Sequence, residues 1–179
     1  AMYIALATVP LVIGGLIISK ALNACNTPLR SLEVIGIASL TMALLMAIAE
    51  SYCRHTRKYE DFTLKDAMIV GIAQVGALIP GVSRSGSTLT AALFRDFSRE
   101  DAAKFSFLLG LPAITGAGLK EFYILYKAGI DAYAWSVLGF GLVVASISAF
   151  GAIWGLLRIL ERFSSWPFVA YRGLMGAFL

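Results

Sequence analysis

A nine-residue polar segment at residues 80–88 interrupts an apolar stretch that covers residues 67–94. The segment reads PGVSRSGST and places an arginine among four hydroxyl side chains. At membrane depth an unpaired arginine costs roughly 3 kcal/mol. Irregular backbone is tolerated at that depth only where protein buries it or where it lines a wet cavity. The segment therefore indicates a binding site inside a membrane protein.

The chemistry of residues 80–88 suits a phosphate group. The glycines let backbone N–H groups approach a ligand, the hydroxyls donate hydrogen bonds, and the guanidinium of Arg84 can bind two phosphate oxygens. A helix that resumes near Gly86 would point its positive N-terminus at the same place. The alternative is a Gly/Ser hinge with Arg84 snorkelling, but Arg84 lies at least ten residues from either end of its segment, about 15 Å along a helix.

The composition predicts a polytopic membrane protein. Hydrophobic residues make up 59% of the 179 residues, charged residues only 15%, and the mean hydropathy is +0.79. Several apolar runs reach the roughly 17–25 residues that a transmembrane helix needs. The net charge of +4 comes from basic residues in short loops, so it marks membrane orientation and does not indicate nucleic-acid binding.

Four apolar segments are long enough to cross a bilayer, whereas residues 67–79 and 86–94 are each too short to cross alone. Ser98 is the expected N-cap of the helix that follows, with acidic residues in its first turn. The predicted spans are 2–19, 32–49, 102–119 and 134–157, with a last apolar helix at 167–179 and loops at 20–30, 50–66, 120–132 and 158–165.

The basic residues of the loops favour a re-entrant path for residues 67–94. If this segment crosses the bilayer, the loops carry seven basic residues on one side of the membrane and six on the other. If it returns to the side it left, the loops carry nine on one side and four on the other. Cytoplasmic loops carry an excess of Lys and Arg, so the second path is favoured, with the nine-charge side cytoplasmic. Two half-helices joined at mid-membrane is an arrangement that transporters use for anionic ligands. The sequence thus predicts an all-α, polytopic transmembrane helical bundle with a re-entrant half-helix pair.

Residues 71–88, GIAQVGALIPGVSRSGST, resemble the second signature of the undecaprenyl-pyrophosphate phosphatases, the bacitracin-resistance family. That signature is Pro-Gly-x-Ser-Arg-Ser-Gly followed by small residues and Thr. The resemblance continues through FSFLLGLP at 105–112 and PFVAYR at 167–172, so it covers essentially the whole chain.

The resemblance implies an inverted-repeat fold in which each repeat has a re-entrant helix pair. The family's first repeat carries a glutamate-rich signature and a Pro-Val-Ser-Ser-Thr-Gly-His stretch, and neither occurs in these 179 residues. We therefore expect residues 1–179 to be a single membrane domain that lacks the first repeat, with a re-entrant hairpin at 67–94 and a phosphate loop at 80–88.

The implied activity is an integral-membrane phosphatase of the bacterial cytoplasmic (inner) membrane. It would hydrolyse undecaprenyl pyrophosphate to undecaprenyl phosphate and phosphate, which recycles the lipid carrier of cell-wall synthesis. Arg84 would hold the pyrophosphate, Ser83 could attack it or simply bind it, and Gln74 would stand where the first repeat has a glutamate. The catalytic candidates are Arg84 and Ser83, and the substrate-binding candidates are Gln74, Gly81, Ser83, Arg84, Ser85, Gly86 and Thr88.

The resemblance also implies a metal ion, which no matched position of this chain binds, and several partners. The family implies a divalent cation, Mg²⁺ or Ca²⁺, but its acidic and histidine ligands have no counterpart here, so no metal ligand is predicted in this chain. The implied partners are the polyprenyl diphosphate, the membrane, the N-terminal repeat and a possible homodimer. The alternative function is a carrier that binds or translocates a lipid phosphate without hydrolysis.

Three residues have simpler interpretations. Gln74 could form an interhelical hydrogen bond as readily as a site contact. His55, the only histidine, is expected to be a solvated loop residue. Arg172 lies five residues into the last apolar helix, where a structural role is favoured.

Overall fold

The computed structural model describes residues 2–22 and 31–179, and all its regular elements are helical in these ranges. The predicted all-α class is confirmed; most of the loop predicted at 20–30 lies outside the described residues. The helices are α1 (Met2–Leu22), α2 (Leu32–Tyr52), α3 (Leu64–Val75), α4 (Arg84–Leu93), α5 (Arg99–Ala128), α6 (Ala132–Arg162) and α7 (Trp166–Phe178), with short 3-10 turns η2 (Tyr59–Asp61) and η3 (Gly76–Leu78).

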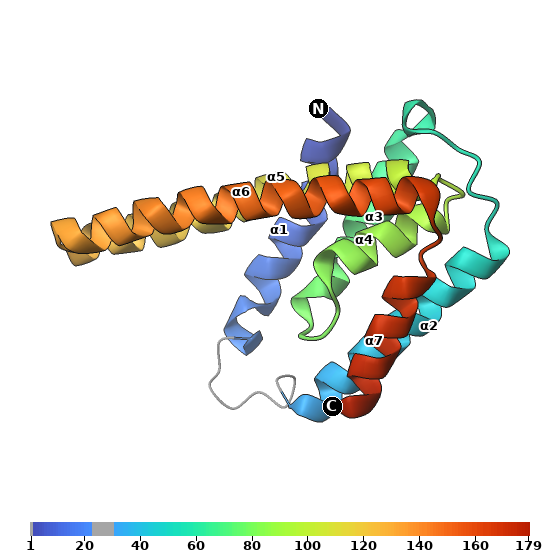
Figure 1. Ribbon diagram of the computed structural model, residues 1–179, viewed down its shortest axis with the longest axis horizontal. Coiled ribbons are helices and arrows are strands. Elements are labelled where there is room, and N and C mark those ends of the chain that lie inside the picture. The colour runs from blue at the N-terminus through green and yellow to red at the C-terminus, as the bar shows by residue number, and fades with distance from the viewer. Residues whose placement is uncertain (1, 23–30) are drawn as a thin grey trace.

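Three helices, α2, α5 and α6, are long and apolar enough to cross a membrane by length and composition. Helices α5 and α6 run side by side as a long hairpin that projects beyond the other helices (Figure 1). No residue of the apolar window of α6 is buried in the chain. An apolar surface of this extent suits lipid rather than water, and the chain is an all-α membrane bundle.

Two predicted loops are wrong because they are helical. Helix α5 continues through most of the loop predicted at 120–132 and ends at Gly129, whose φ of 68° is left-handed. Helix α6 likewise continues to Arg162, so that only three residues of the predicted 158–165 loop separate it from α7. Both stretches contain Leu, Glu and either Lys or Arg, which are strong helix formers, so their charges do not end the helix.

Helices α3 and α4 fold back on each other as a hairpin whose two ends meet. The backbone N–H of Arg57 donates to the Asp96 carbonyl at 2.9 Å, and the N–H of Ser98 donates to the Arg57 carbonyl at 2.8 Å. Asp66 and Arg95 form an ion pair at 2.7 Å. The chain therefore enters and leaves this hairpin at the same place.

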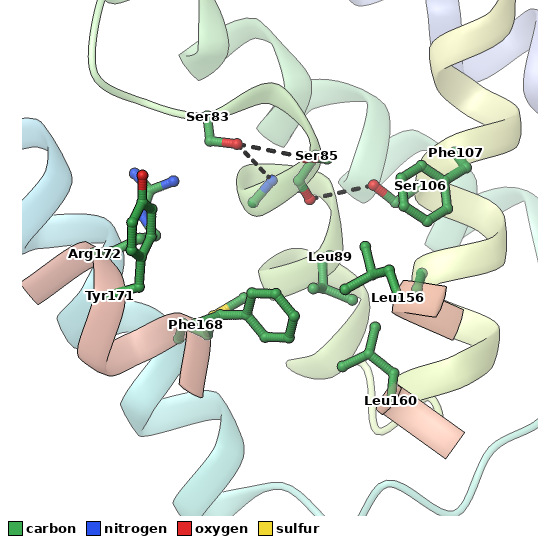
Figure 2. A pocket seen from close by; sticks show the side chains of 13 residues that line it. Ser83, Ser85, Leu89, Ser106, Phe107, Leu156, Leu160, Phe168, Tyr171 and Arg172 are labelled. Atoms are coloured by element: carbon green, nitrogen blue, oxygen red, sulfur yellow. Dashed lines mark hydrogen bonds between the residues drawn. The ribbon is translucent and has the colours of Figure 1, made fainter. Parts of the chain in front are cut away.

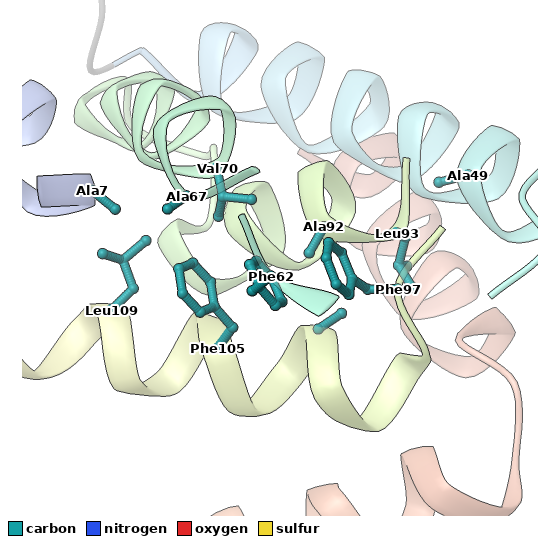
Figure 3. Close-up of a cluster of buried hydrophobic side chains, with 11 residues drawn as sticks. Ala7, Ala49, Phe62, Ala67, Val70, Ala92, Leu93, Phe97, Phe105 and Leu109 are labelled. Atoms are coloured by element: carbon teal, nitrogen blue, oxygen red, sulfur yellow. The ribbon is translucent and has the colours of Figure 1, made fainter. Parts of the chain in front are cut away.

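An aromatic stack fastens the base of the hairpin to α5. The ring of Phe62 stacks on Phe97 at 3.8 Å and on Phe105 at 4.2 Å between centroids. Figure 3 shows these rings among buried side chains from α3, α4 and α5, including Val70 and Leu93. Because this core holds the base, the tip of the hairpin is presented at a defined position.

Candidate phosphate site

The tip of the hairpin packs tightly against α2 at Gly81. This glycine has a φ of 90°, and a Cβ added to it would lie 2.6 Å from the Ile35 carbonyl oxygen. Only glycine meets both conditions without strain. The Gly81 backbone is thus fixed where the chain turns from η3 into α4.

Helix α4 begins just after the tip with a serine cap. The Ser83 hydroxyl accepts a hydrogen bond from the Gly86 N–H at 3.2 Å and lies 3.4 Å from the Ser85 hydroxyl. The N-terminus of a helix carries unpaired N–H groups and a partial positive charge, which favour an anion. The expected helix start beside residues 80–88 is therefore present.

A cavity of about 200 Å³ lies against this first turn of α4. One part of its wall is polar and contains Ser83, Ser85, Gly86, Ser106 and Arg172. Apart from the Tyr171 hydroxyl the remainder is apolar, and Figure 2 shows several of its side chains on the side away from the Ser83 hydroxyl. They include Leu89, Leu156, Leu160 and Phe168. An anionic head group with an apolar tail matches both parts of this wall.

Arg172 places a cation on the cavity wall, although the sequence favoured a purely structural role for this residue. Its Nη2 donates to the Gly81 carbonyl at 2.9 Å. Its Nη1 would lie 3.1 Å from a Cβ placed on Gly86, so the guanidinium sits beside the first turn of α4. The signal that could have found Arg172 is the one used for Arg84, namely a cation in an otherwise apolar helix.

Arg172 is held in place by close packing of α7 on α2. A Cβ added at Gly176 would lie 2.9 Å from the Gly36 carbonyl oxygen. The two backbones can approach this closely because both positions are glycine. One turn before Gly176, α7 carries Arg172 to the tip of the hairpin.

Arg84 is not part of this cavity wall. Its Nη1 donates instead to the Gly110 carbonyl on α5 at 2.9 Å. Thr88 faces the same helix, where its hydroxyl lies 2.5 Å from the Ser106 hydroxyl. The structure therefore brings Ser83, Ser85 and Gly86 onto the wall, and turns Arg84 and Thr88 towards α5.

Gln74 is completely buried in α3, and neither atom of its amide has a hydrogen-bond partner among the described residues. Neither the interhelical hydrogen bond nor the site contact that the sequence suggested for Gln74 is therefore seen among the described residues.

The prediction of a solvated His55 is wrong. Its side chain is 8% exposed, with Nε2 at 3.4 Å from the Glu50 carbonyl, because the loop folds back over the end of α2.

The donors on the cavity wall are suited to binding an anion. Hydroxyls, backbone N–H groups and a guanidinium all donate to phosphate oxygens. Among the described residues, no carboxylate and no imidazole lines this wall. Within residues 2–22 and 31–179, no group of three or more His, Cys, Asp or Glu side chains could hold a metal ion.

The fold and the cavity define an all-α membrane protein with an anion-binding site at a helical hairpin. Residues 1–178 match the family described as "Bacitracin resistance protein BacA", and the chain belongs to this family.

Individual relatives are similar over nearly the whole chain. "Undecaprenyl-diphosphatase 2" of Mesorhizobium japonicum is 64% identical over 179 residues, which is 100% of this chain and 68% of that protein. "Undecaprenyl-diphosphatase" of Synechococcus elongatus is 49% identical over 170 residues, covering 94% of the chain and 59% of the relative. The protein of the same name from Trichormus variabilis is 46% identical over 174 residues, covering 97% and 54%. The chain thus spans between about half and two thirds of the length of these relatives.

Proposed function

We propose that this chain forms the substrate-binding part of an undecaprenyl-diphosphatase. This hydrolase would convert undecaprenyl pyrophosphate to undecaprenyl phosphate and phosphate, recycle the lipid carrier of the cell wall and confer bacitracin resistance. The observation that carries the proposal is the cavity at the start of α4, which joins phosphate-type donors to an apolar wall. Family membership and the names of the relatives support it.

The diphosphate would bind at the first turn of α4. Ser83, Ser85 and Arg172 would donate to its oxygens, while Leu156 and Phe168 would contact the first isoprene units. Such donors neutralise the charge that builds up on the oxygens when the phosphoanhydride bond breaks.

Arg84, the first residue of α4, would turn from α5 to join the diphosphate. It now donates to a neutral acceptor, the Gly110 carbonyl. A charge-assisted bond to phosphate is roughly twice as strong as a bond between neutral groups, and two phosphate oxygens match the fork of the guanidinium. A bound diphosphate would therefore draw Arg84 away from Gly110.

The attacking group must be activated by something other than this wall. Ser83 is the candidate nucleophile, but its hydroxyl caps α4, and none of the described residues that line the cavity is a carboxylate or imidazole base. These donors do not fit a divalent cation either, and the Mg²⁺ or Ca²⁺ that the resemblance implies would take its ligands outside this chain. The proposal therefore includes a glutamate- and histidine-bearing repeat as partner, in a multi-pass protein of the bacterial cytoplasmic membrane that can form a homodimer.

A chimera tests this function. The matching segment of the Mesorhizobium japonicum relative is replaced by this chain, and phosphate release from undecaprenyl pyrophosphate is measured in detergent with the relative itself as the positive control. We expect release by the chimera and binding without release by this chain alone. Binding of the lipid diphosphate by both, with release by neither, would contradict hydrolysis and favour the carrier.

A further inference from the structure

Ser106 is a buried residue of α5 whose hydrogen bonds go to a different helix. Its side chain is on the cavity wall, and the residue is 4% exposed. The hydroxyl lies 2.5 Å from the Thr88 hydroxyl and donates to the Ser85 carbonyl at 3.2 Å. A serine within a helix commonly bonds to a carbonyl of its own helix, as Ser146 does to Leu142 at 2.7 Å. Ser106 instead connects α5 to the first turn of α4.

The available protons limit this connection to two directions. At 2.5 Å one of the two hydroxyls donates to the other, and each has only one proton. Either Thr88 donates to Ser106 and Ser106 donates to the Ser85 carbonyl, or Ser106 donates to Thr88 and Thr88 donates to the Arg84 carbonyl at 3.0 Å. In both directions the bond between Thr88 and Ser106 ties the start of α4, beside the cavity, to α5.

We infer that Ser106 is a positioning residue of the phosphate site. Acting through Thr88 and the Ser85 peptide, it locks the first turn of α4 against α5, so that the hydroxyls and N–H groups of that turn keep their aim at the bound phosphate. This role rests on the proposed function. Phosphoryl transfer depends on such alignment, since a displacement of about 1 Å costs roughly 100-fold in rate.

Removing the Ser106 hydroxyl leaves a chain that can fold. In Ser106→Ala the Thr88 hydroxyl keeps the Arg84 carbonyl at 3.0 Å as an acceptor. The Ser85 carbonyl lies 3.2 Å from the same hydroxyl, so the two carbonyls can share its one proton. No buried group of this network loses its last partner, and the alignment of the turn is what changes.

A double-mutant cycle in the chimera tests the inference. Ser106→Ala, Thr88→Val and the double variant are compared by kcat and KM for undecaprenyl pyrophosphate, with Ser146→Ala as the matched control because its hydroxyl bonds only within α6. We expect Ser106→Ala to lower kcat about 10-fold with little change in KM. Its thermal unfolding should match that of the control. In the Thr88→Val background the same change should cost less than about 2-fold.

Two results would overturn the inference. If Ser106→Ala retains the kcat of the Ser146→Ala control, Ser106 does not position the site. If its effect is undiminished in the Thr88→Val background, Ser106 does not act through Thr88, and the inferred coupling is wrong. Absence of phosphate release by the chimera before any substitution would instead contradict the proposed function, so the two failures are distinguishable.

Discussion

The carboxylate of Asp66 and the guanidinium of Arg95 lie 2.7 Å apart and join the first turn of α3 to the end of α4. Arg57 pairs with the same carboxylate at 2.7 Å, and the Thr63 hydroxyl donates to it at 2.7 Å. Asp66 itself is completely buried. The carboxylate thus closes the base of the hairpin that presents the phosphate site at its tip.

Replacing Asp66 with Asn should destabilise the chain. The substitution removes both ion pairs and leaves Arg57 and Arg95 without their partner, although both arginines keep contact with water. We expect a loss of about 2 kcal/mol in the free energy of unfolding, below the range for fully buried pairs. Unfolding in SDS measures it, with Glu161→Gln as the control because that carboxylate pairs with Arg158 on an exposed surface. Equal stability of the two variants would contradict the prediction.

The same carboxylate should make stability depend on pH only in acid. Burial alone would raise the pKa of Asp66, but hydrogen bonds from Arg57, Thr63 and Arg95 outweigh burial and hold the pKa well below its ordinary value. A lowered pKa stabilises the fold above the unfolded-state value of about 4, and this contribution is lost as the pH falls below it. The difference in stability between the native chain and Asp66→Asn should be constant from about pH 7 to pH 5 and shrink below about pH 4. A difference that shrinks already between pH 7 and pH 5 would show that another group titrates.

The sequence predicts the hairpin and its polar tip because both depend on local pattern. Residues 80–88 interrupt an apolar stretch, and Ser83 caps the helix that follows. The direction of each guanidinium depends on packing between helices that are distant in the chain. Arg84 turns to α5 because Gly110 leaves room for it, since a Cβ at Gly110 would lie 2.5 Å from Arg84 Nη2. Arg172 reaches the cavity only because α7 packs on α2, and no local pattern contains that contact.

Arg172 should be required for binding of the lipid diphosphate. We expect Arg172→Ala to weaken binding by this chain roughly 10- to 100-fold, because Arg172 is the one cation among the described residues of the wall. Arg172→Lys should be intermediate, since an ammonium is a point charge and cannot bind two oxygens as a fork. Binding of undecaprenyl pyrophosphate in detergent measures the loss. Arg158→Ala removes an exposed arginine from α6 and is the control. Unchanged affinity in Arg172→Ala would place the diphosphate elsewhere.

Gln74→Met should separate stability from activity. Met has a similar volume and no hydrogen-bonding amide, so it relieves the burial of two unpaired polar atoms. We expect this chain to gain about 1 kcal/mol in the free energy of unfolding. If the amide serves the phosphate site, the chimera should lose activity at the same time. A more stable variant with full phosphate release would assign Gln74 no part in the site.

Gly81→Ala should destabilise the tip of the hairpin more than a glycine-to-alanine substitution does at an unconstrained position. Alanine at a φ of 90° is strained, and its Cβ would lie 2.6 Å from the Ile35 carbonyl oxygen and 2.8 Å from the Ile35 Cα. Because both neighbours are backbone atoms of α2, they cannot move aside as a side chain can. We expect a loss of about 2 kcal/mol in the free energy of unfolding, together with weaker binding of the lipid diphosphate. Gly116→Ala is the matched control, since a Cβ there meets nothing within 4 Å and alanine favours a helix by about 1 kcal/mol. If the two variants unfold at the same SDS concentration, α2 does not fix the tip, and the aim of Ser83 and Arg172 must come from α5 and α7 instead.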